Sequence, residues 1–163
     1  MEAVSLFLAF VLAMSAVHKV MAPERLGESA ARLAGVPLVD GQMLSFTAAA
    51  IEMAAAVALV FVDSRFVGGL LAAGLWSAYA ALLWRMRGRV LDCGCSFGRQ
   101  EGAVGLFAIS RAAGLAAIAM IPILLPGGSV NVISVFAGLA FLALYLALDA
   151  LLAIPHPHWR HAS

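Results

Sequence analysis

Two cysteines separated by one residue carry the most specific chemical signal in this sequence. Cys93 and Cys95 are the only cysteines of the chain, and Gly94 stands between them. A disulfide holds its two Cα atoms roughly 4.4–6.8 Å apart, so this pair closes only if the chain bends, which glycine permits. The bridge would enclose almost no loop and would therefore stabilise the fold little. Because a strained bridge is easily reduced, the spacing favours reversible thiol–disulfide exchange.

The surroundings of the cysteines also favour reactive thiols. A predicted helix starts a few residues after Cys95, and the positive N-terminal end of a helix stabilises a thiolate. Asp92 precedes the pair, and with His18 it is a candidate for handling protons. Inert or structural cysteines are one alternative; a metal site is another, although two sulfurs alone leave zinc short of ligands. Further cations and possible ligands on the same side are Arg85, Arg87, Arg89, Arg99, His156, His158 and His161.

Ionisable residues inside apolar segments form a second group. Glu52 and Arg111 each lie about ten residues into a predicted membrane span, which places both at a depth of about 15 Å. Opposite charges at equal depth in hydrocarbon are expected to pair, since either alone is costly. Lys19 and Asp149, with His18, belong to the ends of spans on the side of the cysteines. The alternative to a functional role is a polar clamp that only sets how the helices pack.

Composition indicates the elements that must position these residues. Hydrophobic residues make up 64% of the 163 residues and charged residues 12%, too apolar for a soluble domain of this size. A span needs about 20 mostly apolar residues. We therefore predict an all-α membrane bundle, a single transmembrane domain over 1–163, with a four-helix core and a fifth C-terminal helix. The five predicted spans are 3–20, 43–62, 66–84, 103–125 and 130–154.

A short amphipathic helix is predicted between the first two spans. Residues 23–33 begin with Pro23, and apolar residues recur among charged ones at helical spacing. Such a helix would lie in the membrane interface. A polar loop is the alternative. A second local feature is Pro122, which is expected to kink the fourth span.

The basic residues predict an orientation in a bacterial inner membrane. Lys and Arg concentrate on the side that carries the cysteine loop and the C-terminus, while Arg65 alone lies on the side of the N-terminus. The positive-inside rule makes the richer side cytoplasmic, with the N-terminus outside. No basic stripe with interleaved aromatics suggests nucleic acid, so membrane lipid is the expected surrounding. The eight basic residues on the richer side are Lys19, Arg25, Arg32, Arg85, Arg87, Arg89, Arg99 and Arg160.

The chain resembles the methylamine-utilisation MauE family, within the DoxX-like group of small membrane proteins, in three features. They are SAVHK at 15–19, Glu52, and DCGCSFG at 92–98, and the resemblance covers roughly residues 1–125. The family pattern lacks Ser96, which here precedes Phe97. The resemblance implies a membrane protein that works with a thioredoxin-fold partner. In the namesake system the two mature the disulfide-rich small subunit of methylamine dehydrogenase.

The leading hypothesis is a membrane thiol–disulfide redox protein with no cofactor beyond its dithiol, although a quinone is not excluded. Maturation of an exported protein requires chemistry outside, whereas the charge rule places the cysteines inside. Electron transfer across the membrane would reconcile the two. The alternatives are a non-catalytic assembly or anchoring subunit and a small transporter. The sequence leaves open the oligomeric state and the direction of electron flow.

Overall fold

Five helices long and apolar enough to cross a membrane form the molecule, as the sequence predicted. The computed structural model describes residues 1–88, 90–91, 102–103, 105–125 and 127–152. The third span is preceded by one turn of 3-10 helix, η1, and the fourth is made of two consecutive helices. The spans are α1 (Glu2–Met21), α3 (Leu38–Val60), η1 (Val62–Ser64) with α4 (Arg65–Arg85), α5 (Leu106–Ala119) with α6 (Ile121–Leu124), and α7 (Val132–Leu152).

The break in the fourth span lies where the proline was expected to act. Helix α5 ends at Ala119, Met120 forms a turn, and Pro122 sits in the first turn of α6. Proline lacks the N–H that would continue the helix but fits a first turn, where that N–H has no partner. The helix of the fourth span is therefore interrupted within two residues of Pro122, where the sequence predicted a kink.

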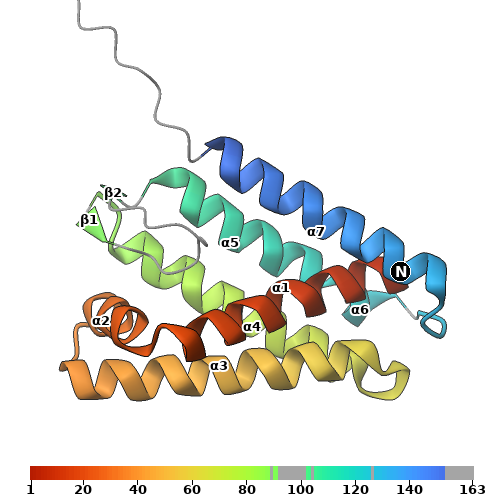
Figure 1. The fold of residues 1–163 in the computed structure, drawn as a ribbon, viewed down its shortest axis with the longest axis horizontal. Coiled ribbons are helices and arrows are strands. Elements are labelled where there is room, and N and C mark those ends of the chain that lie inside the picture. Colours follow the sequence, from red (N-terminus) through yellow and green to blue (C-terminus); the bar gives the residue numbers. More distant parts are fainter. Residues whose placement is uncertain (89, 92–101, 104, 126, 153–163) are drawn as a thin grey trace, which may run out of the picture.

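The amphipathic helix is α2 (Pro23–Ala34), and Pro23 occupies its first turn. Gly35 ends it in the left-handed conformation, with a φ of 71° that side chains disfavour. Leu26, Ser29 and Ala31 are buried, and α2 packs against α3. In Figure 1, α2 is seen nearly end-on while the five long helices run across the view, so α2 crosses the bundle at one end. The predicted short helix between the first two spans is confirmed.

Helix α1 holds the centre of the bundle and packs against α3 and α7. Helix α3 also packs against α4, and α4 packs against α5. Leu8, Leu12 and Leu59 are fully buried where α1 and α3 meet, and Trp76 of α4 completes this core. Helix α7 packs mainly on α1 and leaves most of its apolar surface exposed, as a helix facing lipid does. The bundle is thus a four-helix core with a peripheral fifth helix.

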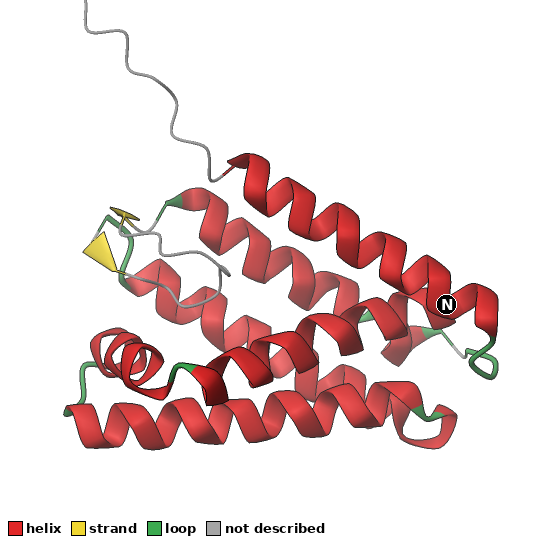
Figure 2. Ribbon diagram, in the orientation of Figure 1, coloured by secondary structure: helices red, strands yellow, loops and turns green. Residues whose placement is uncertain are grey.

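The two ends of the bundle carry different connections (Figure 2). One end holds the N-terminus, η1 and the connection from α6 to α7, and the other holds α2 and two short strands. The strands β1 (Val90–Leu91) and β2 (Gly102–Ala103) pair antiparallel, with Val90 opposite Ala103. These two strands of two residues each were not predicted from the sequence. They interrupt an otherwise helical fold in the described part of the chain.

Candidate functional site

The cysteine segment lies between the two strands in the sequence. Helix α4 ends at Arg85, and Gly88 turns the chain with a φ of 80° just before β1. The antiparallel pairing of β1 with β2 joins the two ends of the segment between them. Asp92, Cys93, Gly94 and Cys95 belong to residues 92–101, which lie outside the described residues. Their predicted roles therefore stay predictions, whereas the base of their loop is defined.

The start of α5 corrects one predicted feature of this loop. The sequence suggested a helix from Ala103, a few residues after Cys95, but α5 begins at Leu106. The physical reason is that Gly102 and Ala103 pair with β1 and so cannot adopt helical backbone. The prediction that a helix N-terminus lies a few residues after Cys95 is therefore no longer supported. The segment that leads from α4 into β1 is still cationic. Arg85 is exposed, and the Arg87 guanidinium lies 5.6 Å from the centroid of the Trp84 ring.

Glu52 is the centre of a buried hydrogen-bonded network at the same half of the bundle. Its side chain is 1% exposed. The Lys19 ammonium donates to both carboxylate oxygens, at 2.7 and 2.9 Å, and also to the Ser15 hydroxyl at 2.8 Å. Ser15 and Tyr79 donate to Oε1 of Glu52, at 2.9 and 3.1 Å. The network joins α1, α3 and α4 through a hydrogen-bonded ion pair, which offsets much of the cost of burying the two charges.

The predicted pairing of Glu52 with Arg111 is wrong. Arg111 forms its ion pair with Asp149 of α7, while Glu52 pairs with Lys19. Equal depth fixes only the position along the bundle axis. The lateral neighbours decide which charges meet: α3 packs against α1, whereas α5 lies beyond α4, on the side of α7.

His18 lies near the network but makes a different contact. Its Nε2 lies 2.6 Å from Nη2 of Arg25, at the junction of α1 and α2. A guanidinium can only donate, so Nε2 accepts and the imidazole proton of the neutral ring is on Nδ1 in this arrangement. His18 is thus joined to the start of the amphipathic helix.

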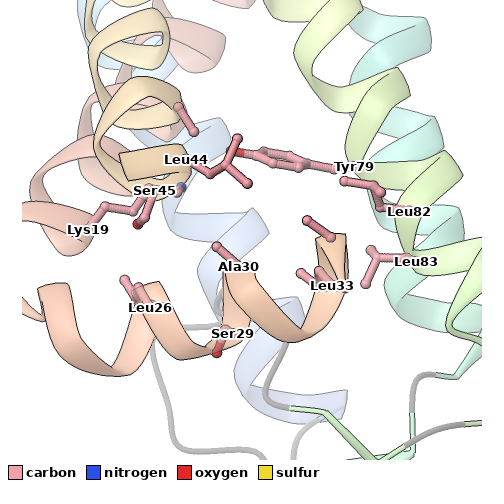
Figure 3. Close-up of a pocket in the computed structure, with 12 residues that line it drawn as sticks. Lys19, Leu26, Ser29, Ala30, Leu33, Leu44, Ser45, Tyr79, Leu82 and Leu83 are labelled. Carbon is pink, nitrogen blue, oxygen red and sulfur yellow. The ribbon is translucent and has the colours of Figure 1, made fainter. Parts of the chain in front are cut away.

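A pocket of about 210 Å³ adjoins the network beneath α2 (Figure 3). Leu26, Ala30 and Leu33 of α2 form one wall, and Lys19 and Tyr79 contribute the polar groups. The three Lys19 hydrogen bonds already go to Ser15 and Glu52, so the pocket offers a mainly apolar lining. Within the described ranges, no group of three His, Cys, Asp or Glu side chains could hold a metal ion.

Sequence reasoning missed two members of the network, Ser15 and Tyr79. Ser15 precedes Lys19 by one helical turn, and this i, i+4 spacing could have placed both on one face of α1. Tyr79 gave no such signal, because its neighbours read as ordinary packing residues. Lys19 was recognised as a polar intramembrane residue but not as the partner of Glu52.

These features define a multi-pass membrane protein with a buried ionic network that joins α1, α3 and α4. The chain matches the family model described as methylamine utilisation protein MauE over residues 1–125. It therefore belongs to the MauE family. The match includes the cysteines, Glu52 and Lys19, and ends at α6, before α7. Searches for a similar curated protein and for a similar solved structure found no match.

Proposed function

We propose that this protein transfers electrons at the membrane by thiol–disulfide exchange. Cys93 and Cys95 would be the reacting pair, and a thioredoxin-fold protein would be the partner. The observation that carries the proposal is the Cys-Gly-Cys sequence in a loop whose ends are joined by a strand ladder. The ladder places the two strands that flank this segment at one end of the bundle, so the partner would approach the protein at that end. Membership of the MauE family supports a place in methylamine utilisation.

The chemistry requires only the two thiols and the partner. The thiolate of one cysteine attacks a sulfur of the partner's disulfide, forming a mixed disulfide and releasing one partner thiolate. The second cysteine then attacks its neighbour's sulfur and releases the other partner thiolate. One disulfide is consumed and one formed, so two electrons pass to the partner, whose thiolates take up the two protons. The reverse sequence reduces this protein.

The buried residues have a positioning role in this proposal. The hydrogen bonds of Glu52 hold α1, α3 and α4 together. His18, joined to Arg25 at the start of α2, and Asp92 are candidates for transferring protons at that end of the bundle. Under the charge rule the loop would face the cytoplasm and exchange thiols with a partner there. Transfer of the two electrons to or from an exported protein on the other side would require a membrane carrier such as a quinone.

A redox titration of the purified protein tests the proposal. Equilibration in thiol buffers of graded potential, followed by alkylation and mass measurement, should show one reversible two-electron couple. The couple should vanish in Cys93→Ser and in Cys95→Ser, because serine retains the approximate size but cannot form the sulfur–sulfur bond. One of the two variants should also retain the partner as a mixed disulfide that reductant dissolves. Full activity of the double variant in the native pathway would refute the relay and favour an anchoring subunit.

A further inference from the structure

A buried cation occupies the end of the bundle opposite the β1–β2 ladder. Arg65 is the first residue of α4, and only 3% of it is exposed. Its Nε donates to the Leu59 carbonyl at 3.4 Å and its Nη1 to the Gly128 carbonyl at 3.1 Å. Nη2 is buried and has no hydrogen-bond partner. A side chain with five donors is therefore only partly satisfied.

No carboxylate neutralises this guanidinium among the residues that the structure describes. Lys19 and Arg111 each have an acidic partner, but Arg65 has only carbonyl oxygens. The nearby Glu2 carboxylate accepts from the backbone N–H of Gly128 and pairs with the N-terminal ammonium. Burying a charge without a counter-ion is costly, so the site favours an anion.

The connection between α6 and α7 lies close to this cation. A Cβ on Gly127 would lie 2.1 Å from Nη1 of Arg65, so a larger residue there would require the guanidinium to move. Helix α4 has no side-chain cap, because the Ser64 hydroxyl donates to the Ala58 carbonyl instead. The positive end of the α4 dipole therefore adds to the charge of Arg65.

Arg65 also lines a pocket of about 300 Å³ between α4 and α6. The other side chains that line it are apolar and include those of Phe66, Pro122, Ile123 and Leu125. The pocket lies at the end of the bundle that holds the N-terminus. The ends of helices that span a bilayer are expected at the level of the lipid headgroups. A cationic group beside apolar walls at this level suits an amphiphile with a negative head.

We propose that this pocket binds the phosphate of an anionic phospholipid. The guanidinium would turn Nη2, which is buried without a partner, toward the phosphate oxygens in a strong charge-assisted contact. One acyl chain of the lipid would cover the apolar walls. The apolar walls argue against a small soluble anion, which gains nothing from them. This lipid site is separate from the proposed relay at the other end of the molecule.

Lipid binding to the detergent-purified full chain tests the proposal by native mass spectrometry and thermal unfolding. The wild type should bind phosphatidylglycerol about tenfold more tightly than phosphatidylcholine, because the choline ammonium already neutralises the phosphate of the second lipid, whereas the phosphate of the first keeps its net charge for Arg65. Arg65→Gln should abolish this preference. Arg85→Gln, at the exposed other end of the same helix, is the matched control and should keep it.

Several outcomes would overturn the lipid site. One is equal binding of the two lipids by the wild type, and another is an unchanged preference in Arg65→Gln. Equal stabilisation by inorganic phosphate without lipid would assign the pocket to a soluble anion instead. If Arg65→Gln does not fold, Arg65→Lys keeps the charge with fewer donors and should reduce the preference; a preference undiminished in that variant would contradict the proposal. The cysteine redox couple, measured in parallel, would be unaffected by any of these results.

Discussion

Three buried or nearly buried cations of this bundle lie in three different environments. Lys19 joins α1 to α3 through Glu52, and Arg111 joins α5 to α7 through Asp149. Arg65 contacts only carbonyl groups in the described part of the chain. The first two pairs connect helices that an apolar interface alone would hold less specifically, since lipid is as apolar as the side chains between helices. Charge thus contributes to which helices meet.

The Lys19–Glu52 pair should show strong energetic coupling. Glu52→Gln or Lys19→Met alone leaves a buried charge without its partner and should cost about 3–5 kcal/mol of unfolding free energy. The double variant should recover much of that loss. A double-mutant cycle by reversible unfolding in mixed micelles measures the coupling. Glu28→Gln on the exposed face of α2 is the control and should change stability by less than about 0.5 kcal/mol. Strictly additive losses would contradict the coupling.

Sequence alone identified the charged residues but not their partners. Glu52 and Arg111 stand out because each interrupts an apolar segment, and their depth follows from the helical rise. Which helices are neighbours depends on packing across the bundle, which no local pattern records. The hydroxyl of Tyr79 illustrates the same limit, since only the approach of α4 to α3 reveals its contact with Glu52.

At the scale of elements, the contact between α2 and α3 depends on close approach of the backbones. A Cβ on Gly41 would lie 2.5 Å from the Gly27 carbonyl oxygen and 2.5 Å from the Ala31 Cβ. Contacts that short do not occur between well-packed atoms, so α2 would have to move. Because α2 also forms a wall of the pocket beside Lys19, this contact fixes the shape of that pocket.

Gly41→Ala should therefore destabilise the protein although it adds one methyl group. Overpacking of this kind costs about 1–3 kcal/mol. Gly74→Ala is the matched control in α4: a Cβ there meets nothing within 4 Å, so it should be neutral or stabilise by up to about 1 kcal/mol. Thermal unfolding of both variants in one detergent compares them. Equal stability of the two would show that α2 is not closely packed on α3.

The helices were predictable because hydropathy and length decide them. The amphipathic helix α2 followed from a proline start and helical spacing, and the break at Pro122 from the missing N–H. The ladder of β1 and β2 was not predictable, since two-residue strands leave no alternating pattern. That ladder also explains why α5 starts three residues later than expected.

The whole molecule is asymmetric along its axis. One end holds α2 and the two paired strands, of which β1 precedes the cysteines in the sequence and β2 follows them. The other end holds the start of α4 with Arg65, and Gly127 and Gly128 lie close to this side chain. The sequence places eight basic residues on the first side and one on the second, and five spans put those sides on opposite faces. The charge bias then predicts that the cysteine end is cytoplasmic.

Labelling of single cysteines in intact cells should reveal this orientation. In a background without Cys93 and Cys95, Ser129→Cys lies exposed between α6 and α7, and Glu28→Cys lies exposed on α2. An impermeant maleimide added outside should label position 129 and miss position 28, because only the first faces the exterior under the charge rule. After the membrane is permeabilised, both should react, which controls for access. Labelling of position 28 alone in intact cells would show the opposite orientation. Labelling of both positions would contradict the placement of α2 and the α6–α7 connection on opposite sides of the membrane.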